Sequence, residues 1–210
     1  MIQEKQFGQD GPELAATLNN LGTAYGSLGD PTKEKDYLER CLMIQEKYFG
    51  TDHPETARAL NNLGSVYGSL GDHTKKTELL ERCLQIEEKH FGKDHHETAD
   101  TLNNLGNAYG SLGDHIKQKE LLERCLKIQE KHFGQDNPET ASALNNLGSA
   151  YGNLGDHAKN IELLERCLSI EEKHFGPYHP ESADTLNNLG YAYGSVGDHV
   201  KKIELLERCL

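Results

Sequence analysis

A five-residue segment, Leu-Asn-Asn-Leu-Gly, recurs along this chain at a constant interval of 42 residues. Its copies begin at Leu18, Leu60, Leu102, Leu144 and Leu186. Five such intervals equal the full length of 210 residues, so the repeat accounts for the whole sequence. Internal repetition at a period of about 20–50 residues is typical of solenoids, in which each unit contacts only its neighbours. The period therefore favours a linear array over a single closed globule.

Each repeat carries the signals of two helices joined by a tight turn. In the second repeat, Asp52 or His53 is expected to cap the first helix, and apolar residues then recur at steps of three and four. Gly71 is expected to end this helix, and Asp72 to cap a second helix that ends at Gly92. No strand pattern competes with this interpretation. We therefore predict an all-α fold.

Two recurring features predict contacts of these helices. Glycine inside a helix costs up to about 1 kcal/mol relative to alanine, so Gly64 and its equivalents are expected to let the paired helix approach closely. Glu78 and Arg82 lie four residues apart in the second helix, and the same pair recurs in three later repeats. This spacing predicts an ion pair along a solvated helix face.

The five cysteines also recur at intervals of 42 residues, always within Glu-Arg-Cys-Leu. Equivalent residues of stacked helix pairs lie roughly 8–10 Å apart, which exceeds the Cα separation of about 7 Å that a disulfide allows. We therefore expect free, buried thiols at the places where helices approach closely. Free thiols throughout are typical of a reducing compartment, which predicts a cytoplasmic protein. The cysteines are Cys41, Cys83, Cys125, Cys167 and Cys209.

The net charge of −12 narrows the classes of partner. Such an acidic chain is poorly suited to bind a nucleic acid or an anionic membrane, because both carry negative charge. No apolar run approaches the roughly 20 residues of a membrane-spanning helix. We therefore expect no nucleic-acid partner and no membrane partner.

The repeats resemble a known family in several places at once. The segments Asn104–Tyr109 (Asn-Leu-Gly-Asn-Ala-Tyr), Leu112–Asp114 and Cys125–Leu126 are similar to the tetratricopeptide (TPR) repeat. The eight residues beyond the usual 34, with Glu-Lys-His-Phe-Gly, resemble the 42-residue repeats of kinesin light chains. The resemblance implies an α-solenoid of helix-turn-helix repeats that forms a right-handed superhelix.

One departure from the family concerns the early part of the second helix. The family has a small alanine there, whereas this chain has longer polar residues. Such side chains imply either a wider spacing between the two helices or a rotation that turns the position outward. The residues are Glu34, Lys76, Gln118, Asn160 and Lys202.

By resemblance, the first helices of successive repeats line a concave groove that binds a peptide. The groove is expected to follow the first asparagine of each pair, together with residues one helical turn before and after it. An asparagine side chain both donates and accepts hydrogen bonds, so it can pair with a peptide backbone of any sequence. Alternatively, these asparagines pair with one another and join adjacent repeats. The candidate residues are Asn19, Arg58, Asn61, Asp100, Asn103, Asn107, Asn145, Ser149, Asn187 and Tyr191.

The charge of this groove narrows the peptide further. Family members that clamp a terminal carboxylate, and kinesin light chains that bind acidic tryptophan-containing motifs, use basic grooves. Here only Arg58 is basic among the candidates, so a neutral-to-basic peptide is expected.

Catalytic and metal-binding interpretations fail because the chemistry-bearing residues recur with the repeat. The 11 histidines include His73, His115 and their equivalents at one place in each repeat, which reflects repeat identity and not convergence on a metal. No Gly-x-x-x-x-Gly-Lys-Ser/Thr phosphate-binding loop is present. We therefore expect no enzyme activity, no metal and no cofactor.

The repeat frame divides the chain into one continuous array. Met1–Gly8 matches the end of a second helix, so the chain is expected to begin and stop within second helices. Uncapped ends invite head-to-tail stacking of identical chains. The leading interpretation is a scaffold that binds a peptide or partner segment; the alternatives are a self-assembling array and the sensor tail of a larger signalling protein. The expected segments are 1–14, full repeats at 15–56, 57–98, 99–140 and 141–182, and a truncated repeat at 183–210.

Overall fold

The computed structural model describes residues 11–209, and these residues form helices and turns without any strand. The all-α fold built from helix pairs is confirmed. The first helices of successive pairs are α2 (Pro12–Ser27), α4 (Pro54–Ser69), α6 (Glu97–Ser111), α8 (Pro138–Asn153) and α10 (Ser182–Ser195). The second helices are α3 (Pro31–Phe49), α5 (His73–Phe91), α7 (His115–Phe133), α9 (His157–Phe175) and α11 (His199–Glu207).

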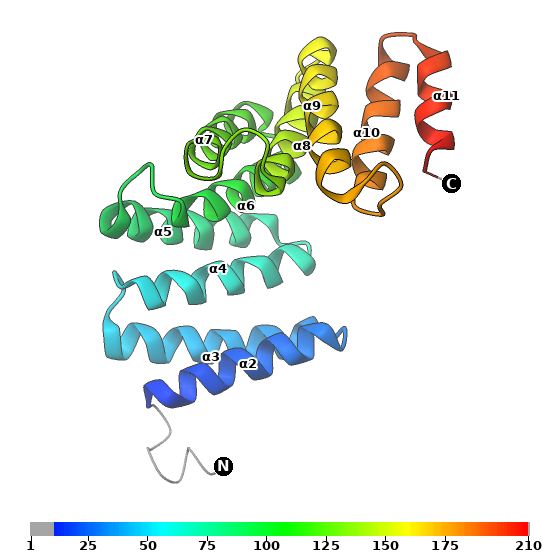
Figure 1. The fold of residues 1–210 in the computed structure, drawn as a ribbon. Helices are drawn as coiled ribbons and strands as arrows, with labels where there is room; N and C mark the ends of the chain where they lie inside the picture. Colours follow the sequence, from blue (N-terminus) through cyan, green and yellow to red (C-terminus); the bar gives the residue numbers. More distant parts are fainter. Residues whose placement is uncertain (1–10, 210) are drawn as a thin grey trace. The chain divides into compact units, whose positions relative to one another are not determined.

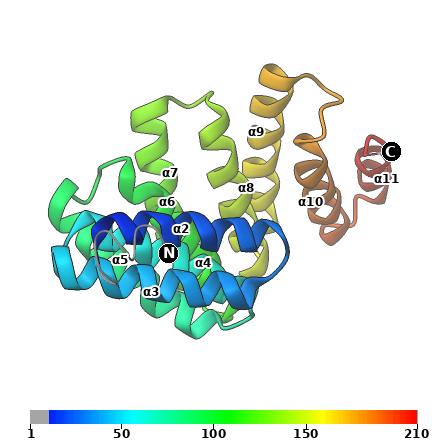
Figure 2. The ribbon, with the colours of Figure 1, turned by 90° about the horizontal axis from the view of Figure 1, so that it is seen from below.

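The described residues belong to two compact units, 1–108 and 109–210, and the division falls inside α6. In the first unit α2 packs on α3, α3 on α4 and α4 on α5, as Figures 1 and 2 show. In the second unit α7 packs on α8, α8 on α9, α9 on α10 and α10 on α11. The expected frame boundaries at 15, 57, 99, 141 and 183 each fall within the first turns of a first helix. The expected segment 1–14 lies mostly outside the described residues, and the single continuous array stays a prediction.

The local signals at the helix ends act as the sequence predicts. His53 is the N-cap of α4, and its Nδ1 atom accepts a hydrogen bond of 3.1 Å from the backbone N–H of Glu55. Asp72 caps α5, and its Oδ1 atom accepts a bond of 2.9 Å from the N–H of Lys75. Gly71 has φ +80, a left-handed conformation that glycine adopts without a steric cost. This turn therefore reverses the chain within a few residues.

Leucine, alanine and cysteine side chains of the paired helices form the core of each unit. Leu60 and Cys83 are fully buried in the first unit, and Leu144 and Cys167 are fully buried in the second. Gly64 lies where α4 meets α5: a Cβ atom there would stand 3.2 Å from Cγ of Leu80. The close approach predicted for this glycine is confirmed.

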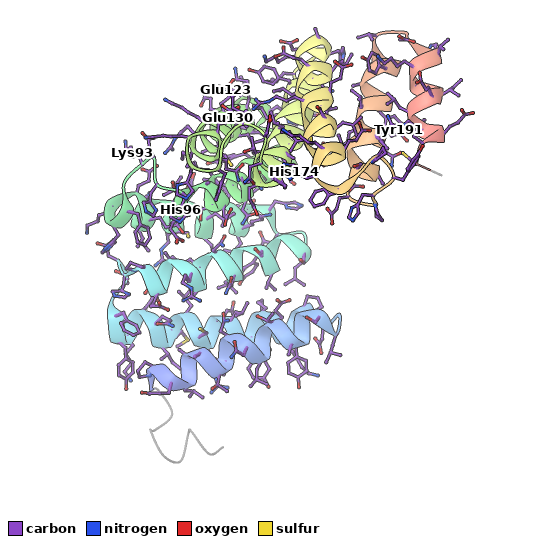
Figure 3. All side chains as sticks on the ribbon, viewed as in Figure 1. Lys93, His96, Glu123, Glu130, His174 and Tyr191 are labelled. Carbon is purple, nitrogen blue, oxygen red and sulfur yellow. The ribbon has the colours of Figure 1, made fainter. Side chains whose placement is uncertain are left out.

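The predicted ion pair within the second helix is wrong for α5 and α9. Arg82 of α5 contacts Glu46 of α3, one repeat earlier, at 2.7 Å, while Glu78 contacts Lys75. Arg166 of α9 makes the equivalent contact with Glu130 of α7 at 2.6 Å. Figure 3 labels Glu130. These arginines therefore join repeats and do not pair along their own helix.

The loops that follow α3 and α7 are held by the next repeat. His174 of α9 contacts the backbone oxygen of Asp136 at 2.7 Å, and Lys173 pairs with the Asp136 carboxylate at the same distance (Figure 3). In the first unit His90 and Lys89 contact Asp52 in the same way. The segment that makes these repeats longer than 34 residues therefore joins the loop after one second helix to the end of the next second helix.

Candidate functional site

The paired asparagines of the first helices bond from one repeat to the next. Asn62 of α4 donates from Nδ2 to Oδ1 of Asn19 of α2 at 2.9 Å. The same bond joins Asn104 to Asn61 at 3.2 Å, and Asn188 to Asn145 at 3.0 Å. The second asparagine thus joins adjacent repeats, which is the structural alternative that the sequence raised. Asn19, Asn61 and Asn145 accept through their oxygens, and an asparagine NH2 group can donate as well.

The candidate residues one helical turn further along differ in exposure. Tyr191 of α10 is 63% exposed, and Figure 3 shows it on the outside of that helix. The ammonium of Lys202 lies 5.2 Å from the centre of its ring. Ser149 and Asn107 are half-buried, and the Ser149 hydroxyl donates to the backbone oxygen of Asn145 at 3.2 Å. Tyr191 is therefore the most accessible of the three.

The charged candidates one turn earlier are both exposed. Arg58 pairs with Glu55 of its own helix at 3.4 Å. Asp100 lies near Glu97, and the two carboxylates repel each other. At this turn of the first helices, α4 therefore carries a cation that Glu55 neutralises, whereas α6 carries a net negative charge.

Two cavities lie between first helices, one in each unit. The first has a volume of about 150 Å³ and brings together Asn19 and Arg58. Its lining comes from α2, α3 and α4: Ala15, Ala16, Asn19, Asn20, Cys41, Gln45, Glu55, Arg58, Ala59 and Asn62. We call it the Gln45 cavity.

The second cavity has a volume of about 260 Å³ and brings together Ser149 and Tyr191. Its lining also includes Gly152, Asn153, His157, Asn160 and Asn188, and so it joins α8, α9 and α10. The other candidates, Asn61, Asp100, Asn103, Asn107, Asn145 and Asn187, line neither of these two cavities.

Each cavity contains a buried amide that sequence reasoning missed as a site residue. Gln45 is 9% exposed, and Asn160 is 8% exposed. The Oε1 atom of Gln45 and the Oδ1 atom of Asn160 have no hydrogen-bond partner among the described residues. A buried carbonyl without a partner costs free energy, so each marks a place where a donor would bind favourably.

The long polar residue early in the second helix is not turned outward. Asn160 and Gln118 are buried, and Lys76 is half-buried. The Nδ2 atom of Asn160 lies only 2.6 Å from where a Cβ on Gly152 would stand. Of the two alternatives, outward rotation is therefore wrong at these positions, because the second glycine of the first helix leaves room for the side chain. The recurring Tyr-Gly eight residues earlier was the signal for this fit.

A second buried position of the second helix alternates between glutamine and glutamate. Where it is glutamate, threonine stands opposite: the Thr185 hydroxyl donates to Oε1 of Glu171 at 3.0 Å, and Cys167 lies 3.4 Å from that hydroxyl. Burial raises the pKa of the Glu171 carboxyl. Where it is glutamine, alanine stands opposite, as Ala59 does beside Gln45. The alternation was visible in the sequence as Gln45, Glu87, Gln129 and Glu171.

The five cysteines are free thiols, and all but Cys209 are buried. Burial raises the pKa of Cys41 to about 11 and that of Cys83 and Cys167 to about 12, so these thiols stay neutral at pH 7. Among residues 11–209, no three histidine, cysteine or carboxylate side chains are placed to hold a metal ion. Within the same residues, the helices are too short or too polar to cross a membrane.

Comparison with known proteins identifies the repeat. Two family models, both described as tetratricopeptide repeat, match the sequence: one over residues 13–75 and 139–210, the other over 56–97 and 98–139. A comparison with curated proteins finds no significant match.

Several solved structures share the fold. A Podosopora anserina protein described as a kinesin light chain with nearly identical TPR-like repeats is 26% identical, with a TM-score of 0.82 over 96% of this chain and 95% of that chain. BtubC (BKLC) from P. vanneervenii is 23% identical, with a TM-score of 0.81 over 94% and 79% of the two chains. MamA from Desulfovibrio magneticus RS-1 is 17% identical, with a TM-score of 0.67 over 93% and 92%.

Proposed function

Because the chain belongs to the tetratricopeptide repeat family, with repeats like those of kinesin light chain, we propose that it is a non-catalytic protein-binding module. Members of this family commonly mediate contacts between proteins. In our proposal, an extended segment of a partner protein lies along the first helices of each unit. No covalent chemistry is required, and no cofactor takes part.

The row of first-helix asparagines is the observation that carries this proposal. The carbonyl oxygens of Asn19, Asn61 and Asn145 accept hydrogen bonds from the next repeat, and the orientation of these three side chains is therefore fixed. Their NH2 groups can donate to the carbonyl oxygens of a peptide backbone. Fixed donors bind at a lower entropic cost than mobile ones, because less side-chain freedom is lost on binding.

The charge of the chain indicates the kind of peptide. The net charge is −12, and the only cation among the ten candidate residues, Arg58, is paired with Glu55. A neutral-to-basic segment avoids the repulsion that an acidic one would meet. We propose such a segment as the ligand, and a cytoplasmic protein as its source.

Peptide display gives the direct test. Random peptides would be selected against the full chain, and the affinity of the selected peptides would be measured by calorimetry. Replacing Asn19 and Asn61 together by alanine should weaken binding about ten-fold or more, because each lost hydrogen bond contributes about 1 kcal/mol. The control replaces Gln85 and Ser169, which are exposed on second helices, by alanine and should leave the affinity unchanged. Equal affinity in both variants would remove the asparagine row from the proposal.

Head-to-tail self-association is a second candidate that one observation favours. Leu21 of α2 is 40% exposed, whereas its equivalent Leu63 of α4 is 3% exposed beneath the preceding second helix. Ile203 of α11 is 57% exposed, whereas its equivalent Thr77 of α5 is buried. A second copy of this chain would cover both faces with the contact that α3 and α4 already make.

Sedimentation velocity over a range of concentrations tests this candidate. Growth of the sedimentation coefficient with concentration, abolished by Leu21→Lys or Ile203→Lys, would support stacking. A constant monomer would exclude it and leave the peptide-binding proposal in place.

A further inference from the structure

The Gln45 cavity differs from the equivalent place in the next repeat at four lining positions, and one of these differences changes the space inside it. Ala59 of α4 lines the cavity, and its equivalent in α6 is Thr101. Thr101 is 1% exposed, and its hydroxyl lies 3.5 Å from Sγ of Cys83. The space that alanine leaves open in one repeat is therefore filled by threonine in the next.

The hydrogen bonds of Gln45 in the cavity also differ from those of its equivalent, Glu87, in the next repeat. Cys83 donates to Oε1 of Glu87 at 3.4 Å and Thr101 also bonds this carboxyl, whose Oε2 atom has no partner among the described residues. In the Gln45 cavity there is no such hydroxyl, and Oε1 of Gln45 has no partner among the described residues. The floor of the cavity thus contains a carboxamide whose oxygen has no hydrogen-bond partner among the described residues.

The rest of the lining is small and uncharged at depth. Ala15 is fully buried, and Cys41 is a neutral thiol because burial raises its pKa to about 11. The charged residues, Glu55 and Arg58, stand at the rim, where they pair with each other. A charged group on the floor would lose its hydration without gaining a counter-ion, so the cavity selects against one.

We infer that the Gln45 cavity binds the side-chain amide of an asparagine or glutamine in the partner peptide. Two carboxamides complement each other, since each supplies both a donor and an acceptor. Rotation of the Gln45 amide about its last side-chain bond presents either group to the ligand. A cavity of about 150 Å³ is known to hold a molecule the size of benzene, so it accommodates a carboxamide side chain.

This inference deepens the proposed function and rests on it for the peptide context of the amide. The neighbouring Asn19 lines the same cavity and belongs to the asparagine row. A peptide whose backbone follows that row would therefore pass the mouth of the cavity. The Gln45 cavity would then fix the register of the peptide by one side chain.

The first test uses a small amide, which requires no peptide. Propionamide would be titrated into the isotope-labelled full chain while the side-chain NH2 signals of Gln45 are followed by NMR. We expect saturable shifts with a dissociation constant on the order of millimolar, as for other ligands of a few atoms. Butanone, which has a similar size and no N–H donor, and propionate, which is charged, should each bind at least about ten-fold more weakly.

The chain itself supplies the matched variant. Ala59→Thr adds to α4 the side chain that α6 already carries at Thr101, so it should fold and fill the cavity. It should weaken propionamide binding at least about ten-fold. Ser65→Thr makes a threonine at an exposed position of α4 outside the cavity and should have no effect. Equal shifts in Ala59→Thr, or equal binding of butanone, would overturn the inference.

The peptide test separates this inference from the function on which it rests. The probes are acetyl-Ala-Ala-Gln-Ala-Ala-amide and its versions with Leu or Glu at the centre. Preference for Gln that Ala59→Thr removes would support the cavity as a peptide subsite. Peptides that bind the asparagine row with no preference for Gln would overturn the subsite and leave the function standing. Propionamide binding blocked by Ala59→Thr, with no peptide bound by either protein, would support the amide chemistry of the cavity and overturn the proposed function.

Discussion

The hydroxyl of Tyr67 in α4 donates a hydrogen bond of 2.7 Å to Oε1 of Glu39 in α3, across the joint between two repeats. Tyr151 makes the same bond to Glu123 of α7 at 2.6 Å. These bonds lie beside the cores of the two units, and each ends on a charged acceptor. A bond of this kind is stronger than one between neutral groups.

We therefore expect Tyr67→Phe to lower the free energy of unfolding by about 1.5 kcal/mol, since a carboxylate loses its donor. The equivalent Tyr25 of α2 lies before any described second helix and stacks on Tyr37 with its ring centre 5.4 Å away. Tyr25→Phe is thus the control and should change stability by less than about 0.5 kcal/mol. Urea unfolding followed by circular dichroism measures both. Equal losses would show that the Glu39 bond contributes nothing.

The same bonds predict a loss of stability at alkaline pH. The hydrogen bond to glutamate, and then burial, raises the pKa of Tyr67 to about 12, and Tyr151 behaves alike. The ordinary tyrosine pKa is about 10. Between that pH and about 12, these tyrosines are ionised in the unfolded chain but still protonated in the folded chain, so the folded state binds more protons. Stability conferred by these tyrosines is complete below pH 10 and is lost as the pH rises towards 12.

The double variant Tyr67→Phe with Tyr151→Phe tests this window. The stability difference between the native chain and the variant should shrink between about pH 9.5 and 12. In the double variant, titration of the phenolate absorbance should show two fewer tyrosines, and the missing ones should be those that ionise at the highest pH. A difference that stays constant with pH would contradict the assignment.

The sequence predicts the local structure well because each local signal acts within a few residues. Asp72 at the start of α5 and Gly71 before it need only their immediate neighbours to form the turn. Gly64 was also identified correctly, since the propensity cost of glycine inside a helix indicates that a packing contact, here with Leu80, requires it.

Contacts between repeats could not be predicted in the same way. Arg82 has a glutamate four residues before it and another 36 residues before it, and the sequence offers both in nearly every repeat. The choice of Glu46 depends on how two helix pairs stack, which no local pattern encodes. Gln45 was missed for the same reason: its cavity is lined by residues of three helices, among them the small Ala59 of the next repeat.

The position that alternates between glutamine and glutamate also predicts how stability depends on pH. Burial raises the pKa of Glu87, so its charged form is disfavoured in the folded state. Glu87→Gln should therefore raise the free energy of unfolding at pH 7 by about 1 kcal/mol, because glutamine is already tolerated at Gln45. As the pH falls towards the ordinary glutamate value of about 4.3, the native carboxyl takes up its proton and the advantage disappears.

Urea unfolding at several pH values between about 4 and 8 measures this effect, and Glu120→Gln, at an exposed position of α7, is the control. The native chain should gain stability relative to Glu87→Gln as the pH falls, because its folded state binds the proton more tightly than its unfolded state. The opposite trend would mean that Glu87 is stabilised in its charged form.

The two glycines of α4 should respond in opposite directions to alanine. At Gly64 a Cβ atom would stand 3.2 Å from Cγ of Leu80, which is fully buried and cannot move away. The overpacking costs about 1–3 kcal/mol, which exceeds the gain of about 1 kcal/mol in helix propensity. At Gly68 the Cβ would stand 2.8 Å from Cδ of Lys76, a flexible side chain that can swing into solvent.

Gly68→Ala should therefore leave stability unchanged or raise it by up to about 1 kcal/mol, whereas Gly64→Ala lowers it. Burial lowers the pKa of Lys76 in the native chain, so displacement of its side chain into water should return that pKa towards its ordinary value of 10.5. NMR titration of the Lys76 ammonium reports this displacement, and thermal unfolding reports the stability. A loss of stability at Gly68 equal to that at Gly64 would show that Lys76 is held as firmly as Leu80.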